Sequence, residues 1–204
     1  MRGQAMKKVC NKLVLYGEDL SRMDALEFFA RTGEWQTIEY VNQVNSLSAW
    51  EISPEYEKSL RENLPNANIE IDDSFSLAKD KKYRNKFQFI VFDNPQNVFN
   101  SYCEHFEAIE LVPLLSKGKS IVIFNVNLNP FNYDSSPEWK SRRQEYYGSD
   151  ADSLSIDFLI GFYKRKFIDM GLDIRFCFEE KRNDEYLSYL VMGIENNISS
   201  AVDF

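Results

Sequence analysis

The sequence has little of the residue types that build metal centres and disulfide frameworks. It contains one histidine, His105, and three cysteines, which are Cys10, Cys103 and Cys177. A single histidine excludes a multi-histidine metal site, and three widely separated cysteines are atypical of a disulfide scaffold or a zinc site. We therefore expect no metal cofactor, and the candidate chemistry rests on acids, amides and backbone groups.

Long apolar runs and positive charge are also scarce. No apolar run approaches the roughly 20 residues that a membrane-spanning helix needs, and residues 1–8 lack the apolar core of a signal peptide. These features predict a cytoplasmic protein without a membrane partner. The net charge of −8 disfavours a general nucleic-acid-binding protein, because such proteins neutralise phosphates with Lys and Arg.

What the chain does have is apolar and aromatic side chains for a core. Apolar residues make up 44% of its 204 residues and aromatic residues 15%, which suits one domain over residues 1–204. Residues 1–22 are expected to form an N-terminal helix or arm. Residues 127–155 lack clear periodicity, and so long a segment is typical of a functional loop. We interpret it as a lid or acceptor-site insertion, with a packed surface loop as an equally weighted alternative.

Apolar periodicity predicts strands that alternate with helices along most of the chain. The expected strands cover residues 25–30, 46–50, 69–71, 87–92, 120–126, 172–178 and 186–194. The expected helices cover residues 34–44, 53–63, 106–115 and 155–170. Such alternation is typical of an α/β fold with a parallel, doubly wound sheet, in which ligands bind at the carboxyl ends of the strands.

The stretch that follows the first expected strand carries the strongest functional signal. An apolar run with one acid, Glu27, ends in Arg-Thr-Gly at 31–33 and passes into the expected helix. Strand, tight turn and helix N-terminus is an arrangement that holds nucleotide-like cofactors. The second strand ends in Glu51, at the position where an acid accepts hydrogen bonds from ribose hydroxyl groups.

Four segments carry a resemblance to a known family. Residues 26–33 (Leu-Glu-Phe-Phe-Ala-Arg-Thr-Gly), 49–54 (Ala-Trp-Glu-Ile-Ser-Pro), 69–75 (Ile-Glu-Ile-Asp-Asp-Ser-Phe) and 89–95 (Phe-Ile-Val-Phe-Asp-Asn-Pro) follow one another in order. They resemble the first four motifs of the class I S-adenosylmethionine-dependent methyltransferases, and the likeness covers roughly residues 20–194. The resemblance implies a mostly parallel seven-stranded sheet with helices on both faces and a C-terminal antiparallel hairpin.

The same resemblance implies S-adenosylmethionine as the cofactor and assigns roles to residues at the strand ends. Glu27 and Gly33 would support the methionine part, Glu51 would hold the ribose, and Asp73, in preference to Asp72, would face the adenine. Asp93 and Asn94 would lie near the methyl group as the catalytic residues. The complete set of cofactor-binding candidates is Glu27, Phe29, Ala30, Arg31, Gly33, Glu51, Ile52, Asp73, Ser74 and Asp93.

Arg31 departs from the family pattern, which has glycine at that position because the backbone approaches the cofactor closely. An arginine there would clash with the cofactor, point away from it, or form a bidentate pair with the cofactor's carboxylate. The sequence leaves all three arrangements open.

Three classes of function remain. The first is an active methyltransferase that acts on a small molecule or on a protein or glycan end. The second is a nucleic-acid methyltransferase, in which Lys140, Arg142 and Arg143 would contact phosphates and nearby tyrosines would stack on bases. The third is a non-catalytic binding protein that keeps the fold. We favour the first class. His105 is a candidate general base, although a lone histidine at a helix start is more often a surface or capping residue.

Overall fold

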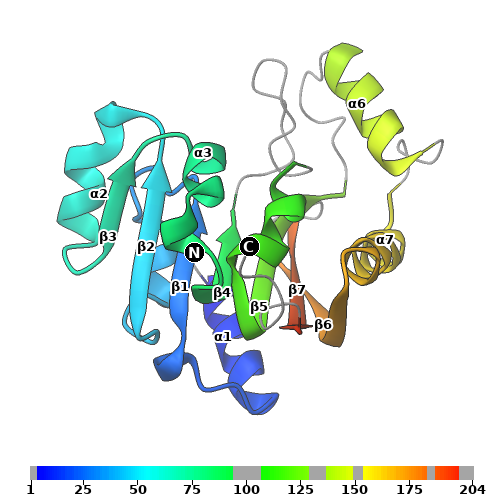
Figure 1. Cartoon of the computed structure of the whole chain (residues 1–204), viewed down its shortest axis with the longest axis horizontal. Coiled ribbons are helices and arrows are strands. Elements are labelled where there is room, and N and C mark those ends of the chain that lie inside the picture. The colour runs from blue at the N-terminus through cyan, green and yellow to red at the C-terminus, as the bar shows by residue number, and fades with distance from the viewer. Residues whose placement is uncertain (1–3, 94–106, 129–136, 149–153, 183–186, 198–204) are drawn as a thin grey trace.

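The computed structural model describes residues 4–93, 107–128, 137–148, 154–182 and 187–197 (Figure 1). Seven strands form one mixed sheet in the order β3-β2-β1-β4-β5-β7-β6. Strands β3, β2, β1, β4 and β5 are parallel to one another, and β7 runs antiparallel to both β5 and β6. The bounds are β1 Asp24–Phe28, β2 Ser46–Glu51, β3 Asn68–Ile71, β4 Phe87–Phe92, β5 Ser116–Asn127, β6 Leu172–Lys181 and β7 Leu187–Asn196. The predicted doubly wound sheet with a C-terminal antiparallel hairpin is therefore confirmed.

The central strands are buried on both faces, which explains their nearly continuous apolar sequences. Successive residues of β4 enter opposite cores: Phe89 and Val91 pack on one face of the sheet, and Ile90 and Phe92 on the other. This alternation follows from the two-residue period of a strand. The same alternation in β1 places Glu27 on the face of Ala25, which belongs to the core that contains Phe89 and Val91.

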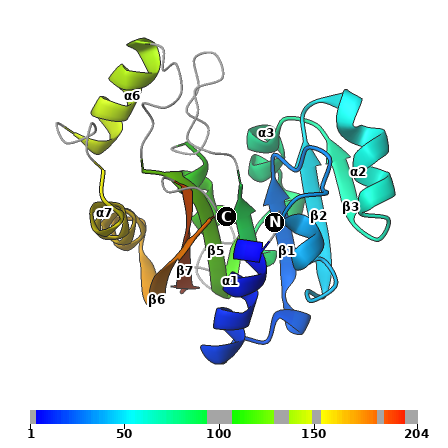
Figure 2. The ribbon, with the colours of Figure 1, turned by 180° about the vertical axis from the view of Figure 1, so that it is seen from behind.

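Helices cover both faces of the sheet. Helices α1 (Gln4–Leu15) and α2 (Glu57–Asn63) contribute side chains to the core that holds Phe89, and α1 lies in front of the sheet in Figure 2. Helices α3 (Ser74–Lys79), α5 (Val112–Leu115) and α7 (Ile156–Asp169) pack on the opposite face. Short 3₁₀ turns lie between these elements at η1 Leu20–Arg22, η2 Thr37–Glu39, η3 Pro54–Tyr56, η4 Lys81–Tyr83 and η5 Ile109–Leu111.

The predicted helix over residues 34–44 is wrong. The segment forms turns and the short η2 instead. Two residues of its expected apolar face, Trp35 and Ile38, are 41% and 47% exposed, whereas Thr37 and Tyr40 are buried. The helical spacing of apolar residues therefore does not describe the buried side of this segment.

Three further features bear on the prediction. The helix expected over residues 106–115 ends at Leu115 as predicted, but β5 begins at Ser116 instead of residue 120. Strand β6 continues to Lys181 through its pairing with β7, and the side chains of Glu179 and Glu180 bind Ser188 and Lys12 respectively. The expected insertion at 127–155 contains helix α6 (Pro137–Tyr147), so it is not a structureless loop.

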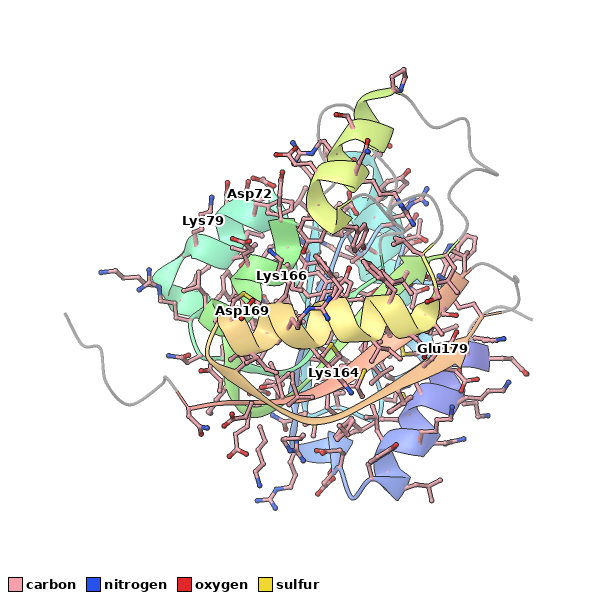
Figure 3. All side chains as sticks on the ribbon, turned by 90° about the vertical axis from the view of Figure 1, so that its right-hand side faces the viewer. Asp72, Lys79, Lys164, Lys166, Asp169 and Glu179 are labelled. Atoms are coloured by element: carbon pink, nitrogen blue, oxygen red, sulfur yellow. The ribbon has the colours of Figure 1, made fainter. Side chains whose placement is uncertain are left out.

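The predicted helix over residues 155–170 is confirmed as α7. The Ser155 hydroxyl accepts a hydrogen bond from the Phe158 amide at the helix start, and the chain turns after the helix at Gly171 with φ +79. Figure 3 shows α7 lying across the sheet, with Lys164, Lys166 and Asp169 along it. Among the described residues, no helix is long and apolar enough to cross a membrane.

At Gly33 the loop after β1 packs closely against helix α2. Its φ is +68, and a Cβ atom there would lie 2.7 Å from Leu64 Cδ1 and 2.9 Å from Leu60 Cδ1. Both leucines belong to the buried core on that face. The close approach at this glycine is therefore to the side chains of α2 and the residue after it.

Gly33→Ala is expected to lower the free energy of unfolding by about 2 to 4 kcal/mol, because it adds both backbone strain and a steric clash. Gly118→Ala is the matched control, since Gly118 has φ +57 but no atom within 4 Å of the added Cβ. The control isolates the backbone strain and is expected to lose only about 1 kcal/mol. Urea denaturation measures both values, and equal losses would contradict the packing role.

Candidate functional site at the carboxyl edge of the sheet

The strand registers bring most of the predicted site residues to one edge. Phe28 of β1 lies beside Phe92 of β4, so the loop after β1 and Asp93 leave the sheet next to each other. On the other side, Glu51 at the end of β2 is paired with Ile71 at the end of β3. Carboxyl ends of neighbouring parallel strands are where open α/β sheets bind ligands.

The loop after β1 has an alternating backbone conformation. Phe29, Arg31 and Gly33 have φ values of +59, +49 and +68, the left-handed region that glycine adopts most easily. The intervening Ala30 amide donates to the Trp50 carbonyl over 2.9 Å, which ties the loop to β2. The loop thus has a glycine-type backbone at two positions that carry side chains.

Arg31 points its side chain along the loop toward η3. The residue is exposed, and its Cζ atom lies 5.6 Å from the centroid of the Tyr56 ring, which is a cation–π arrangement. Of the three arrangements that the sequence left open, the structure shows the guanidinium directed at Tyr56.

Glu51 holds this loop in place with its carboxylate. One oxygen accepts the Arg31 amide over 2.7 Å, and the other accepts the Ser53 amide over 2.8 Å. The side chain is buried, whereas the next residue, Ile52, is 61% exposed. A carboxylate oxygen accepts more than one hydrogen bond, so each Glu51 oxygen retains acceptor capacity beyond the bond that it already makes.

Glu27 lies beneath the loop. Its side chain is 1% exposed and accepts hydrogen bonds from the Tyr40 hydroxyl and from Gln36 Nε2, the latter over 3.3 Å. Burial raises the pKa of Glu27 from 4.5 to about 7, against the opposing effect of these hydrogen bonds. Glu27 is therefore buried beneath the loop with two hydrogen-bond donors, and its role toward the methionine part of the cofactor stays a prediction.

Asp93 follows β4 and belongs to the same polar network. Its Oδ1 lies 3.3 Å from Nη1 of Arg182. Burial raises the pKa of Asp93 from 3.8 to about 6, while the Arg182 charge and the polar side chains of Tyr189 and Gln36 act in the opposite direction. Gln36, which donates to Glu27, thus interacts with both acids.

At the end of β3 the two neighbouring acids have different surroundings. Asp73 is the N-cap of α3, and its carboxylate accepts hydrogen bonds from the Phe75 amide, the Ser76 amide and the Ser76 hydroxyl. Asp72 is exposed at the surface (Figure 3), and its carboxylate accepts the Asp73 amide over 2.7 Å. Ser74 is buried as the first residue of α3. Asp72 is thus the more accessible carboxylate, although Asp73 is the one we predicted.

The remaining predicted residues divide into two groups. Asn94 and His105 lie outside the described residues, as does the side chain of Lys140. Arg142 forms an ion pair with Glu107, and Arg143 is 2% exposed within α6. Of the two arginines predicted to contact phosphates, Arg142 is therefore paired with an acid and 39% exposed, and Arg143 is buried.

Sequence reasoning missed four residues of the polar network, which are Gln36, Tyr40, Arg182 and Tyr189. Gln36 and Tyr40 lie in the segment that we predicted as a helix, and the prediction considered only the apolar positions of that segment. The last two lie on the C-terminal hairpin, far along the chain from the acids they meet. An isolated acid in an otherwise apolar strand was the one available signal, because such an acid needs buried partners.

Glu27→Gln is expected to remove a pH-dependent part of the stability. The unfolded chain ionises Glu27 near its ordinary pKa of 4.5, whereas the folded protein keeps the proton up to about pH 7. Stability from this group is therefore complete below pH 4.5 and is lost as the pH rises through 7, by about 3 kcal/mol in total. Urea denaturation of both proteins across this range measures the difference, and parallel profiles would contradict the assignment.

Comparison with known proteins gives matches at the level of structure. Neither protein-family models nor curated protein sequences match the chain. A protein from Streptococcus mutans described as a SAM-dependent methyltransferase superposes with a TM-score of 0.61 at 12% identity, over 91% of this chain and 48% of that one. Trm1 from Pyrococcus horikoshii, solved with S-adenosyl-L-methionine, gives a TM-score of 0.64 at 12% identity, over 94% and 54%.

A third structure matches over most of both chains. The protein yhhF from Escherichia coli, described as a methyltransferase, gives a TM-score of 0.56 at 12% identity, over 94% of this chain and 86% of that one. By contrast, the chain spans about half the length of the Streptococcus mutans and Pyrococcus horikoshii proteins. With the observed strand order, these likenesses show that the chain has the fold of the class I S-adenosylmethionine-dependent methyltransferases.

Proposed function

We propose that the protein transfers a methyl group from S-adenosylmethionine to a small molecule or to a protein or glycan end. The observation that carries this proposal is the grouping at the end of β2. Glu51 fixes the glycine-type loop through the Arg31 amide and the turn after β2 through the Ser53 amide, and the exposed apolar Ile52 lies next to it. An acid for a ribose and an apolar surface for a base thus stand side by side at the ligand edge.

The residues present fit this cofactor. The free acceptor capacity of Glu51 suits ribose hydroxyl groups, and the side chain of Ile52, which is 61% exposed, suits the face of an adenine. Asp72, rather than the capping Asp73, has the accessible carboxylate for the adenine amino group. Arg31 is directed at Tyr56, so its guanidinium lies on the η3 side of the loop.

The chemistry asked of the protein is modest. When bound, S-adenosylmethionine supplies the activated methyl group, so the protein mainly orients the acceptor and takes up a proton. Asp93 is the group for that task, because it ends the central strand β4 and an ion pair with Arg182 favours its charged form. Its raised pKa brings it closer to the working pH of a general base.

A non-catalytic binding protein is the second candidate. Side chains at Phe29 and Arg31 occupy positions with glycine-type backbone, and these side chains add bulk where a cofactor's carboxyl end would approach. A nucleic-acid acceptor is less favoured, because Arg142 is paired with Glu107 and Arg143 is buried.

Ile52→Glu tests the proposed adenine contact. We expect this variant to weaken binding of S-adenosylhomocysteine about tenfold or more, because it replaces apolar contact with a desolvated charge. Ile168→Glu is the matched control, since Ile168 on α7 is 59% exposed and lies outside the site. Calorimetric titration measures both dissociation constants.

Equal affinities of the two variants for S-adenosylhomocysteine would contradict the proposed contact between Ile52 and the adenine. Failure of the wild-type protein to bind S-adenosylhomocysteine at millimolar concentration would overturn the proposal and favour the non-catalytic protein. Binding of RNA or DNA with a steep dependence on salt would instead indicate a nucleic-acid acceptor.

A further inference from the structure

The C-terminal hairpin reaches across the sheet to the end of β4. Arg182 directly follows β6, and its Nη1 lies 3.3 Å from Oδ1 of Asp93. The two side chains are only 22% and 11% exposed, so the pair is largely shielded from water. Its electrostatic interaction is therefore stronger than that of a surface ion pair.

The guanidinium group is itself held in place. Its Cζ atom lies 5.0 Å from the centroid of the Tyr189 ring on β7, and the Arg182 backbone amide donates to the Leu187 carbonyl over 3.0 Å. The Tyr189 side chain also acts to lower the pKa of Asp93. Arg182 is thus fixed between an aromatic ring and the carboxylate that it contacts.

Strand β5 restrains the backbone of Asp93. Asn125, which is 1% exposed, donates from Nδ2 to the Asp93 carbonyl over 3.4 Å. Asn125 and Tyr189 are paired residues on β5 and β7. Three strands of the C-terminal half of the sheet therefore restrain one acid at the ligand edge.

We propose that Arg182 is a positioning residue that fixes both the orientation and the negative charge of the Asp93 carboxylate, so that docking of the C-terminal hairpin completes the site. The inference rests on the proposed function only for what the carboxylate does in the reaction. Its physical content, the control of Asp93 by Arg182, is independent of the cofactor and of the acceptor.

The charges around Asp93 explain why one cation has this effect. Glu27 of β1 lies near enough for the Asp93 charge to raise its pKa, while Gln36, Tyr189 and Asn125 are neutral. Among the described residues, Arg182 is the cation that pairs with Asp93. Removal of its charge leaves a buried carboxylate beside another acid, which favours the protonated form of Asp93.

The test is a ¹³C NMR titration of the aspartate side-chain carboxyl carbons in the ligand-free protein. Asp93→Asn identifies the Asp93 signal. In Arg182→Met we expect the midpoint of that signal to rise by about one to two pH units, and in Arg182→Lys to return toward the wild-type value. Arg175→Met is the matched control, because Arg175 lies on β6, the strand that precedes Arg182, in a comparably buried ion pair with Glu18. The control is expected to leave the Asp93 midpoint unchanged.

An Asp93 midpoint in Arg182→Met that equals the wild-type value would overturn the proposal, as would an equal rise in Arg175→Met. If the methionine variant does not fold, Arg182→Gln decides in the same way, because it keeps a hydrogen-bond donor without the charge. Since the titration uses neither cofactor nor acceptor, its failure is distinguishable from a failure of S-adenosylhomocysteine to bind.

Discussion

The buried carboxyl group of Glu27 is the constraint on which the ligand edge depends. It sits at 1% exposure in the central strand, and a buried acid without partners would cost several kcal/mol. Tyr40 and Gln36 supply the hydrogen bonds, and Gln36 also acts to lower the pKa of Asp93. The demand for these partners gives a physical reason why residues 34–45 form turns over the end of β1. The polar groups around Glu27 and Asp93 also lie where β1 and β4 meet, between the N-terminal and C-terminal halves of the sheet.

The loop above Glu27 keeps the backbone of a glycine-rich turn with few glycines. Two residues of β2 stabilise this backbone: the Glu51 carboxylate accepts the Arg31 amide, and the Trp50 carbonyl accepts the Ala30 amide. Left-handed conformations at Phe29 and Arg31 cost of order 1 kcal/mol each, and the crosslinks to β2 offset that strain. The remaining glycine, Gly33, serves the packing of the loop against Leu60 and Leu64. The role of each loop position therefore follows from its neighbours more than from its residue type.

Much of the sheet was predictable from the sequence, because a strand buried on both faces has a distinctive apolar run. The bounds of β4, Phe87–Phe92, agree with the prediction, and the acid at the end of β2 was found from strand spacing alone. The segment 34–44 was mispredicted because helical spacing of apolar residues ignores a buried acid's need for Gln36 and Tyr40. Arg182 and Tyr189 were missed for another reason, since their contact with Asp93 depends on long-range strand order. Asp73 shows a third limit, because an acid before a helix is equally a ligand contact and an N-cap.

The central claim is that a nucleoside cofactor binds at the carboxyl ends of β1, β2, β3 and β4. The most direct measurement is a map of backbone amide chemical shifts from ¹H–¹⁵N NMR spectra recorded as S-adenosylhomocysteine is added. The account predicts saturable changes concentrated in residues 29–33, 51–53, 72–75 and around Asp93, with little change along α1 and the outer face of α7. Changes centred elsewhere on the molecule, or none at millimolar ligand, would contradict it.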